Sequence, residues 1–279
     1  MSKPLRDRAF PVILVVVLLT LLAFGVRTWR LEVKGLWYDE SLSLYRAQLS
    51  VPGILANTIA FPGITTIDLH PPLYFLLLHG LTRLAGESDF VLRFLSVFWA
   101  VLLVPLLYAV GARFWNPRVG LIAALLGALS PFYLWYAQEA RMYTMVTALG
   151  LLAVYAFDCA LEERHAGWLL LAAVASLAVA YTHYLALTLV GVMAIHALLA
   201  ALRLRRNWRI AIVLALIGVI VGSLPVSTYA LHRLTMGREV EREFLPLLTI
   251  LRDALHAFSV GLTLHWQTWW PVDMLFLAL

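Results

Sequence analysis

Long apolar runs separated by short polar stretches dominate the pattern along the chain. Seven of these runs carry no formal charge and are long enough to suggest membrane-spanning helices. They cover residues 9–26, 94–112, 119–136 and 142–157, two parts of 166–202, and 210–231. As one helix, residues 166–202 would extend for about 55 Å, so we expect two spans joined by a hairpin at 182–184. The pattern predicts an all-α polytopic membrane protein, a helical bundle with about seven complete spans.

Residues 71–84 are also apolar, but their length argues against a further span. The stretch begins with two prolines, contains Arg83, and would reach only about 21 Å as a helix. If it does not cross, the arginine-bearing loops 113–118 and 203–209 lie on the side of the N-terminus, as the positive-inside rule prefers. We therefore expect a cytoplasmic N-terminus in an inner, or plasma, membrane.

This topology divides the chain into one transmembrane module, residues 1–279, with three outer loops. The first, 27–93, is long and is expected to carry helices that lie on the membrane surface. The second lies near 137–142 and the third covers 232–270.

Composition supports a membrane protein and narrows its partners. At 62% hydrophobic and 13% charged residues, a soluble domain of this length could not cover itself with polar surface. The net charge of +5 comes from arginines in short loops between apolar runs, which indicates topology signals rather than a nucleic-acid-binding face. The single cysteine, Cys159, excludes an intrachain disulfide, and no Cys/His spacing typical of a metal site is present.

Candidate chemistry gathers in polar clusters at the ends of apolar runs. Ionisable groups at a bilayer edge are costly, so such clusters indicate a functional site. Under the expected topology one face of the membrane holds Asp39, Glu40, His70, Glu139, Arg141 and His183. Their shared side makes a single site possible.

The order of these motifs resembles a known family. Trp-Tyr-Asp-Glu follows the first span, His-Pro-Pro-Leu-Tyr covers 70–74, Val-Leu-Arg-Phe covers 91–94, and Ser-Pro at 130–131 leads into Gln-Glu-Ala-Arg-Met-Tyr at 138–143. Over essentially the whole chain, this set resembles bacterial polyprenyl-phosphate-sugar glycosyltransferases of the membrane-embedded C-type fold, which are related to protein O-mannosyltransferases and the lipid A aminoarabinose transferase.

The resemblance implies inverting transfer of a sugar from a polyprenyl-phosphate-linked donor to a protein, lipid or glycan acceptor at the non-cytoplasmic membrane face, in the cell envelope. Relatives continue with several more spans. The last apolar stretch here begins near Val272 and stops at Leu279, so we expect a truncated form whose catalysis depends on the spans that would follow.

The resemblance also implies roles for individual residues. Asp39 would act as the base or orient the acceptor, with Glu40 and Glu139 as the other catalytic carboxylates. A departing polyprenyl phosphate needs cationic partners, for which Arg141 and His70 are the candidates. The donor-binding group further contains Tyr143, His183 and Tyr184. No cofactor or obligatory metal is expected, although the three carboxylates leave a divalent cation open.

Structural roles and other functions remain open at this stage. Asp39 could cap a helix, Glu139 and Arg141 could form a local salt bridge, His183 could cap the hairpin, and the tyrosines could belong to an interfacial belt. A transporter would place its ionisable groups near the midplane and show paired repeats, neither of which is evident here. A non-catalytic scaffold or an inactive fragment of a transferase is the other alternative.

Overall fold

The computed structural model describes residues 5–61, 64–67, 70–236 and 245–278, and helices dominate it. The first part of the chain contains α1 (Leu5–Thr28), α2 (Tyr38–Gln48), α3 (Val51–Ala56), strands β1 (Thr58–Phe61) and β2 (Ile64–Ile67), and α4 (Leu73–Ala85). The remainder contains α5 (Asp89–Phe114), α6 (Pro117–Leu129), α7 (Pro131–Ala137), α8 (Tyr143–Glu163), α9 (Ala166–Thr182), the 3₁₀ turn η1 (Tyr184–Ala186), α10 (Leu187–Leu202), α11 (Arg206–Met236), α12 (Leu247–Ser259) and α13 (Trp266–Leu277).

The predicted all-α membrane fold is confirmed, but the number of spans differs. Within the described ranges, five helical segments are long and apolar enough to cross a bilayer: α1, α5, α8, η1 with α10, and α11. The bent pair α6 and α7 adds a sixth if it is taken as one span. The expected hairpin at 182–184 is present, but α9 has only 17 residues, or about 26 Å of helix, and falls short of a complete span.

The expected span at 119–136 is not one continuous helix, because the helix breaks between α6 and α7 with a bend of 53°. Ser130 begins α7 by accepting the Tyr133 amide on its hydroxyl at 3.4 Å, and Pro131 occupies the first turn. Proline has no amide to donate and suits a helix start, so the Ser-Pro pair ends one helix and begins another. The bend lets the segment after α7 meet α2, where the Ala140 amide donates to Glu40.

Two glycines allow α5 and α6 to pack with their backbones in direct contact. A Cβ at Gly111 of α5 would lie 2.8 Å from the Gly120 Cα, and a Cβ at Gly120 of α6 would lie 2.6 Å from the Tyr108 carbonyl oxygen. Both contacts involve backbone, which cannot move aside as a flexible side chain does. Small residues at such crossings let helices associate in a membrane, where apolar side chains alone provide little drive.

We therefore expect Gly120→Ala to lower the free energy of unfolding by about 1–3 kcal/mol, the usual cost of overpacking. Gly218→Ala is the matched control, because Gly218 lies in α11 and a Cβ there meets nothing within 4 Å. Since alanine is the better helix former, this control should be neutral or slightly stabilising. Chemical unfolding in detergent micelles measures both, and equal stability of the two variants would contradict the close contact.

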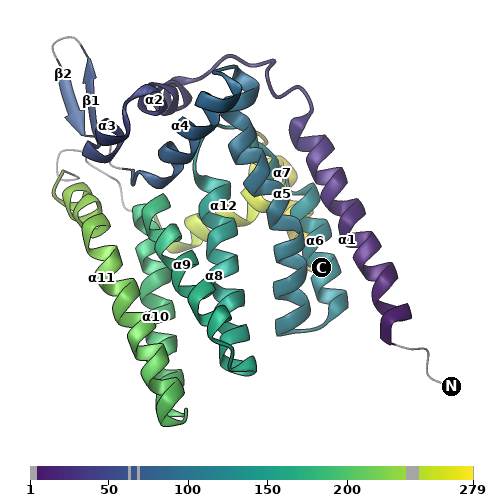
Figure 1. Cartoon of the computed structure of the whole chain (residues 1–279). Coiled ribbons are helices and arrows are strands. Elements are labelled where there is room, and N and C mark those ends of the chain that lie inside the picture. Colours follow the sequence, from purple (N-terminus) through teal and green to yellow (C-terminus); the bar gives the residue numbers. More distant parts are fainter. Residues whose placement is uncertain (1–4, 62–63, 68–69, 237–244, 279) are drawn as a thin grey trace.

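The long connection between α1 and α5 folds over one end of the bundle (Figure 1). Its α4 is only 13 residues long and does not qualify as a span, as expected for 71–84. It packs Tyr74, Phe75 and Leu78 into a core shared with Leu92 of α5 and Met145 of α8. Helices in this connection were expected, but the antiparallel hairpin of β1 and β2, which pairs Thr58 with Ile67, was not.

The domain boundaries stay a prediction. The first connection, between Thr28 and Asp89, agrees in position with the expected outer loop 27–93. The expected third loop, 232–270, begins inside α11, contains α12 and reaches α13, while its residues 237–244 lie outside the described residues.

A buried arginine joins the first helix to the bundle. Arg27, near the end of α1, is fully buried and donates to the carbonyl oxygens of Ala128 at 3.0 Å and Gly127 at 2.8 Å. These carbonyls belong to the last turn of α6, the negative end of its dipole. The arginine therefore satisfies acceptors that an isolated helix end leaves open and adds a favourable charge–dipole interaction.

Candidate functional site

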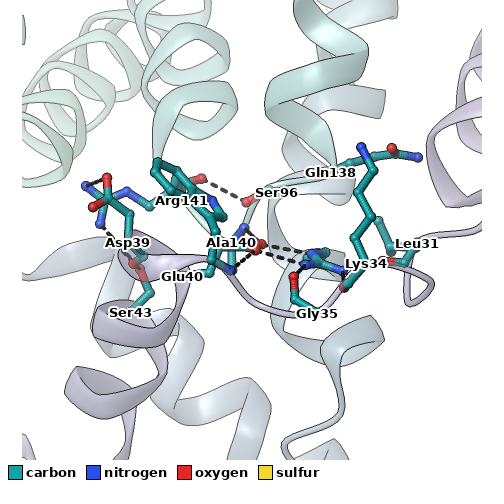
Figure 2. A network of polar contacts seen from close by, with 12 residues as sticks. Leu31, Lys34, Gly35, Asp39, Glu40, Ser43, Ser96, Gln138, Ala140 and Arg141 are labelled. Atoms are coloured by element: carbon teal, nitrogen blue, oxygen red, sulfur yellow. Dashed lines mark hydrogen bonds and ion pairs between the residues drawn. The ribbon is translucent and has the colours of Figure 1, made fainter.

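Glu40 lies in the first turn of α2 and holds three parts of the chain together. Its carboxylate receives two hydrogen bonds from Arg93 of α5, both at 2.8 Å, and one from the Ala140 amide at 2.9 Å. The Trp37 amide donates to it at 3.3 Å. Both charged side chains are buried, with 1% of Glu40 and 3% of Arg93 exposed. Figure 2 shows Glu40 of α2 beside Ala140 of the segment that follows α7.

Arg93 extends the same network to the segment that follows α1. It donates to the carbonyl oxygens of Leu31 at 2.7 Å, Lys34 at 2.8 Å and Gly35 at 3.2 Å. Burial raises the pKa of the Glu40 carboxyl, but the hydrogen bonds and charge of Arg93 and the donated amides outweigh burial, so this pKa lies below its ordinary value. Glu40 is therefore an ionised carboxylate with its acceptor positions occupied, an arrangement suited to positioning its neighbour Asp39.

Asp39 and Arg141 face each other across the entrance to the site. The Asp39 carboxylate is 30% exposed and lies 3.8 Å from an Arg141 guanidinium nitrogen, whereas Arg141 is almost fully buried. Trp37 is the N-cap of α2, so Asp39 belongs to the first turn and is not the cap residue. Arg141 pairs with Asp39, and the local contact with Glu139 is a backbone hydrogen bond at 2.7 Å.

The guanidinium of Arg141 is buried without short contacts to a carboxylate. Besides Asp39 it reaches the Ser43 hydroxyl at 3.5 Å, the Asp39 carbonyl at 3.4 Å and the His70 Nε2 at 3.3 Å. Its Nε has no hydrogen-bond partner among the residues that the structure describes. Buried cations are normally paired at short range, as Arg93 is with Glu40. Arg141 therefore has donor capacity that an anionic ligand could use.

Aromatic and imidazole rings surround this cation. The His70 and His183 rings lie 5.7 Å apart, and His183 stacks on Tyr184 at 4.9 Å. Tyr143 lies 6.3 Å from His183, and its ring lies 5.9 Å from the Arg141 guanidinium carbon. The structure thus brings the sequence-predicted donor-binding residues together from three parts of the chain: the segment before α4, the start of α8, and the turn between α9 and α10.

His183 is held as a neutral ring. Its Nδ1 accepts the Leu185 amide at 3.2 Å, so it caps η1 as one structural reading anticipated. Burial, followed by electrostatic interaction with the neighbouring His70 and Arg141, lowers the pKa of His183 from 6.5 to about 4. The ring can therefore donate a hydrogen bond from Nε2 at neutral pH, but it brings no positive charge.

This shift predicts loss of stability in acid. In the unfolded chain His183 takes up a proton as the pH falls through 6.5, whereas in the folded chain it resists protonation down to about 4. The contribution of His183 to the free energy of unfolding is therefore fully present above pH 6.5 and is lost as the pH drops toward 4. We expect His183→Gln to reduce this fall in the unfolding temperature, and the exposed His265→Gln to leave it unchanged. Parallel curves for all three proteins would contradict the assignment.

Glu139 borders a cavity of about 430 Å³ beside the Glu40–Arg93 pair. Trp37, Trp135, Tyr136 and Tyr143 form much of its aromatic wall. Burial raises the pKa of the Glu139 carboxyl, and the charges of Glu40 and Asp39 add to the effect despite opposing contacts from Trp135 and Arg141. A carboxylate whose pKa is raised is a stronger base than an ordinary carboxylate.

Sequence reasoning missed the arginines that organise the site. Arg93 was noted only as part of a motif, and Arg46 was not considered. Arg46 is fully buried, donates to the His70 carbonyl at 2.8 Å and to the Ile54 carbonyl at 3.2 Å, and lies over the Phe75 ring at 4.0 Å. The available signal was a charge at the edge of an apolar run, which requires a buried partner.

The expectation of no obligatory metal remains a prediction. Among the residues that the structure describes, His, Cys, Asp and Glu form no group of three or more that could hold a metal ion. Asp39, Glu40 and Glu139 instead differ in surroundings: Asp39 is partly exposed beside Arg141, Glu40 is paired with Arg93, and Glu139 borders the cavity.

Solved structures place the fold among large membrane transferases. The chain aligns with the S. cerevisiae protein O-mannosyltransferase Pmt1-Pmt2 complex bound to the sugar donor, at a TM-score of 0.59 and 18% identity, over 86% of this chain and 34% of that one. It also aligns with the Archaeoglobus fulgidus oligosaccharyltransferase in the apo form, at a TM-score of 0.56 and 14% identity, over 90% of this chain and 38% of that one. The chain therefore spans little more than a third of either protein, and at these identities the likeness shows the fold alone.

Sequence comparison identifies the family. No curated protein matches the chain. The family model described as dolichyl-phosphate-mannose-protein mannosyltransferase matches residues 69–229, which is more than half of the sequence and includes His70, Arg93, Arg141 and His183. The chain belongs to the dolichyl-phosphate-mannose-protein mannosyltransferase family.

Proposed function

We propose that the protein transfers a sugar from a polyprenyl-phosphate-linked donor to an acceptor hydroxyl, with inversion at the anomeric carbon, at the non-cytoplasmic membrane face. The observation that carries this proposal is the buried Arg141, whose guanidinium has only long contacts and a free Nε among the described residues. Membership of a mannosyltransferase family supports a sugar as the transferred group.

The donor phosphate would lie against Arg141, with His70 and the neutral His183 completing the donor set. An arginine fork matches a phosphate oxygen pair better than a point charge does, and its strength is greatest where water is excluded. Tyr143 and Tyr184 would cover the sugar or the first isoprene unit, because their rings adjoin the same cation and imidazoles. Arg46 holds the backbone of His70 in place by donating a hydrogen bond to its carbonyl oxygen.

Transfer then requires one proton movement and one bond exchange. The acceptor oxygen attacks the anomeric carbon from the face opposite the phosphate, and the bond between that carbon and the phosphate oxygen breaks. Asp39 takes the acceptor proton, and Arg141 stabilises the negative charge that develops on the departing polyprenyl phosphate. Direct displacement from the opposite face inverts the anomeric centre.

The other two carboxylates receive different roles. Arg93 and two backbone amides already donate hydrogen bonds to the Glu40 carboxylate. We therefore assign Glu40 to positioning Asp39 rather than to the catalytic role expected from the sequence. Glu139 faces the aromatic cavity and would contact the acceptor.

The test is transfer of radiolabelled sugar by membranes that contain the protein, supplied either with polyprenyl-phosphate sugars or with nucleotide sugars. We expect transfer only from the lipid-linked donors. Arg141→Gln should reduce it by about 10²–10³-fold, the usual effect of losing one preorganised donor to a developing charge. Arg141→Lys should recover part of the activity, since it restores the charge without the fork.

Arg83→Gln is the control, because Arg83 is an exposed cation of α4 outside the site. It should transfer at the wild-type rate. Full activity of Arg141→Gln at wild-type protein levels, or transfer from nucleotide sugars alone, would contradict the proposal.

A further inference from the structure

A second and larger cavity, about 820 Å³, lies between the end of α1, the segment that follows it, and α7. Its apolar wall includes Leu22 and Val26 of α1 and Leu134 of α7. Its polar wall includes Arg30, Lys34 and Gln138. In Figure 2, Lys34 and Gln138 lie on the opposite side of Glu40 from Asp39 and Arg141, so this cavity is separate from the proposed donor-phosphate position.

One end of this cavity is open to the membrane interior. Leu22 and Val26 belong to the part of α1 that can span the bilayer, yet they are 45% and 37% exposed. Gly25 lies between them, and a Cβ at that position would meet nothing within 4 Å. Trp29, one turn further along, is 73% exposed, as is usual for a tryptophan at the membrane–water boundary. An occupant would therefore have an apolar part at bilayer depth.

The other end carries an uncompensated positive charge. Among the residues that the structure describes, three cations line the cavity, Arg30, Lys34 and Arg93, and no carboxylate does. Arg93 is neutralised by Glu40, but within the described ranges Arg30 and Lys34 form no ion pair. The Lys34 ammonium lies 5.4 Å above the ring of Trp135, which lines the neighbouring cavity of Glu139, so this cation is held where the two cavities adjoin. An anion would complement the positive charge at this end of the cavity.

We propose that this cavity binds a phosphate-bearing lipid of the surrounding bilayer, distinct from the sugar donor, with its phosphate at Lys34 and Arg30 and its chain along Leu22, Gly25 and Val26. A peptide is the poorer fit, because its backbone would bury polar groups against the apolar α1 wall without partners. Lys34, Arg93 and Gln138 also border the cavity of Glu139, so the bound phosphate lies where the two cavities meet. Binding does not depend on the transfer reaction.

The test is photocrosslinking of the purified protein in phosphatidylcholine vesicles that contain a small fraction of photoactivatable phosphatidic acid. Digestion and mass spectrometry locate the labelled peptides. We expect labelling of the peptides that contain residues 22–34 and 131–138, and much weaker labelling there by a photoactivatable phosphatidylcholine of the same chain length. Lys34→Gln and Arg30→Gln should each reduce the phosphatidic acid signal by about fivefold, the effect of one basic residue near an anionic lipid.

Two further variants separate the lipid site from a general effect of charge. Gly25→Leu fills the chain-binding part of the cavity without changing any charge, and it should reduce labelling as strongly as Lys34→Gln. Arg83→Gln removes an exposed cation elsewhere and should leave labelling unchanged. Excess unlabelled phosphatidic acid should compete, whereas inorganic phosphate should not.

The proposal is overturned if phosphatidylcholine labels the two peptides as well as phosphatidic acid does. It is equally overturned if labelling is unaffected by Lys34→Gln and Gly25→Leu, or if inorganic phosphate competes as effectively as the lipid. Arg141→Gln should retain labelling, so loss of the donor site and loss of this site give different results.

Discussion

Asp39→Asn is expected to reduce sugar transfer by about 10²–10⁴-fold, the range attributed to a positioned general base. The substitution keeps the shape of the side chain and its first-turn position in α2, but an amide cannot take the acceptor proton. Because Asp39 is 30% exposed and its contact with Arg141 is long, the change should leave the fold intact. The measurement is the transfer rate at saturating donor, with protein amount and unfolding temperature determined on the same preparations.

Glu87→Gln provides the control for Asp39→Asn, since Glu87 is an exposed carboxylate that bonds only to Gln48 among the described residues. It should transfer at the wild-type rate. If Asp39 acts as the base, the maximal rate should fall while the donor concentration for half-maximal rate changes little. A full rate for Asp39→Asn would remove Asp39 from the mechanism and move attention to Glu139, whose raised pKa also suits a base.

Arg93→Leu is expected to lower the free energy of unfolding by about 3–5 kcal/mol, because it leaves the buried Glu40 carboxylate without its charged partner. Glu40→Met should cost a similar amount by leaving Arg93 unpaired. The double variant Glu40→Met/Arg93→Leu should be more stable than the sum of the single changes predicts, since no isolated charge remains. Denaturant unfolding in detergent micelles measures all four proteins.

Recovery in that double variant should be incomplete. Arg93 also donates to the carbonyl oxygens of Leu31, Lys34 and Gly35, and these acceptors lose their partner in either background. The exposed Arg118→Leu is the control and should change stability little. Additive effects of the two single changes would show that the pair does not act as a unit.

The apolar pattern predicted most of the fold because a segment that spans a bilayer must form all its backbone hydrogen bonds within the protein. A long apolar segment therefore forms a helix. Its failures have local causes. The Ser-Pro pair at 130–131 was visible, but a proline within an apolar run does not reveal whether it kinks a span or ends one. The hairpin of β1 and β2 had β-branched residues as its signal, which are common in membrane helices as well.

The candidate site shows a similar division. Asp39, His70 and Arg141 were predicted from motif order and His183 from its expected place on the same membrane face, and the structure brings the four together. Their individual environments were not predictable, because Glu40 meets an arginine 53 positions later and burial lowers the pKa of His183. Adjacent residues such as Asp39 and Glu40 have different surroundings for reasons that appear only in the tertiary fold.

The contact of Arg27 with α6 has a consequence for the order of assembly. Its acceptors are made about one hundred residues later in synthesis, at positions 127 and 128. Until then α1 can cross the bilayer only if its guanidinium extends to the interfacial water, as long basic side chains do. We therefore expect α1, although it leaves the ribosome before α5 and α6, to dock late, after the α5–α6 pair has been inserted and offers the two carbonyl groups.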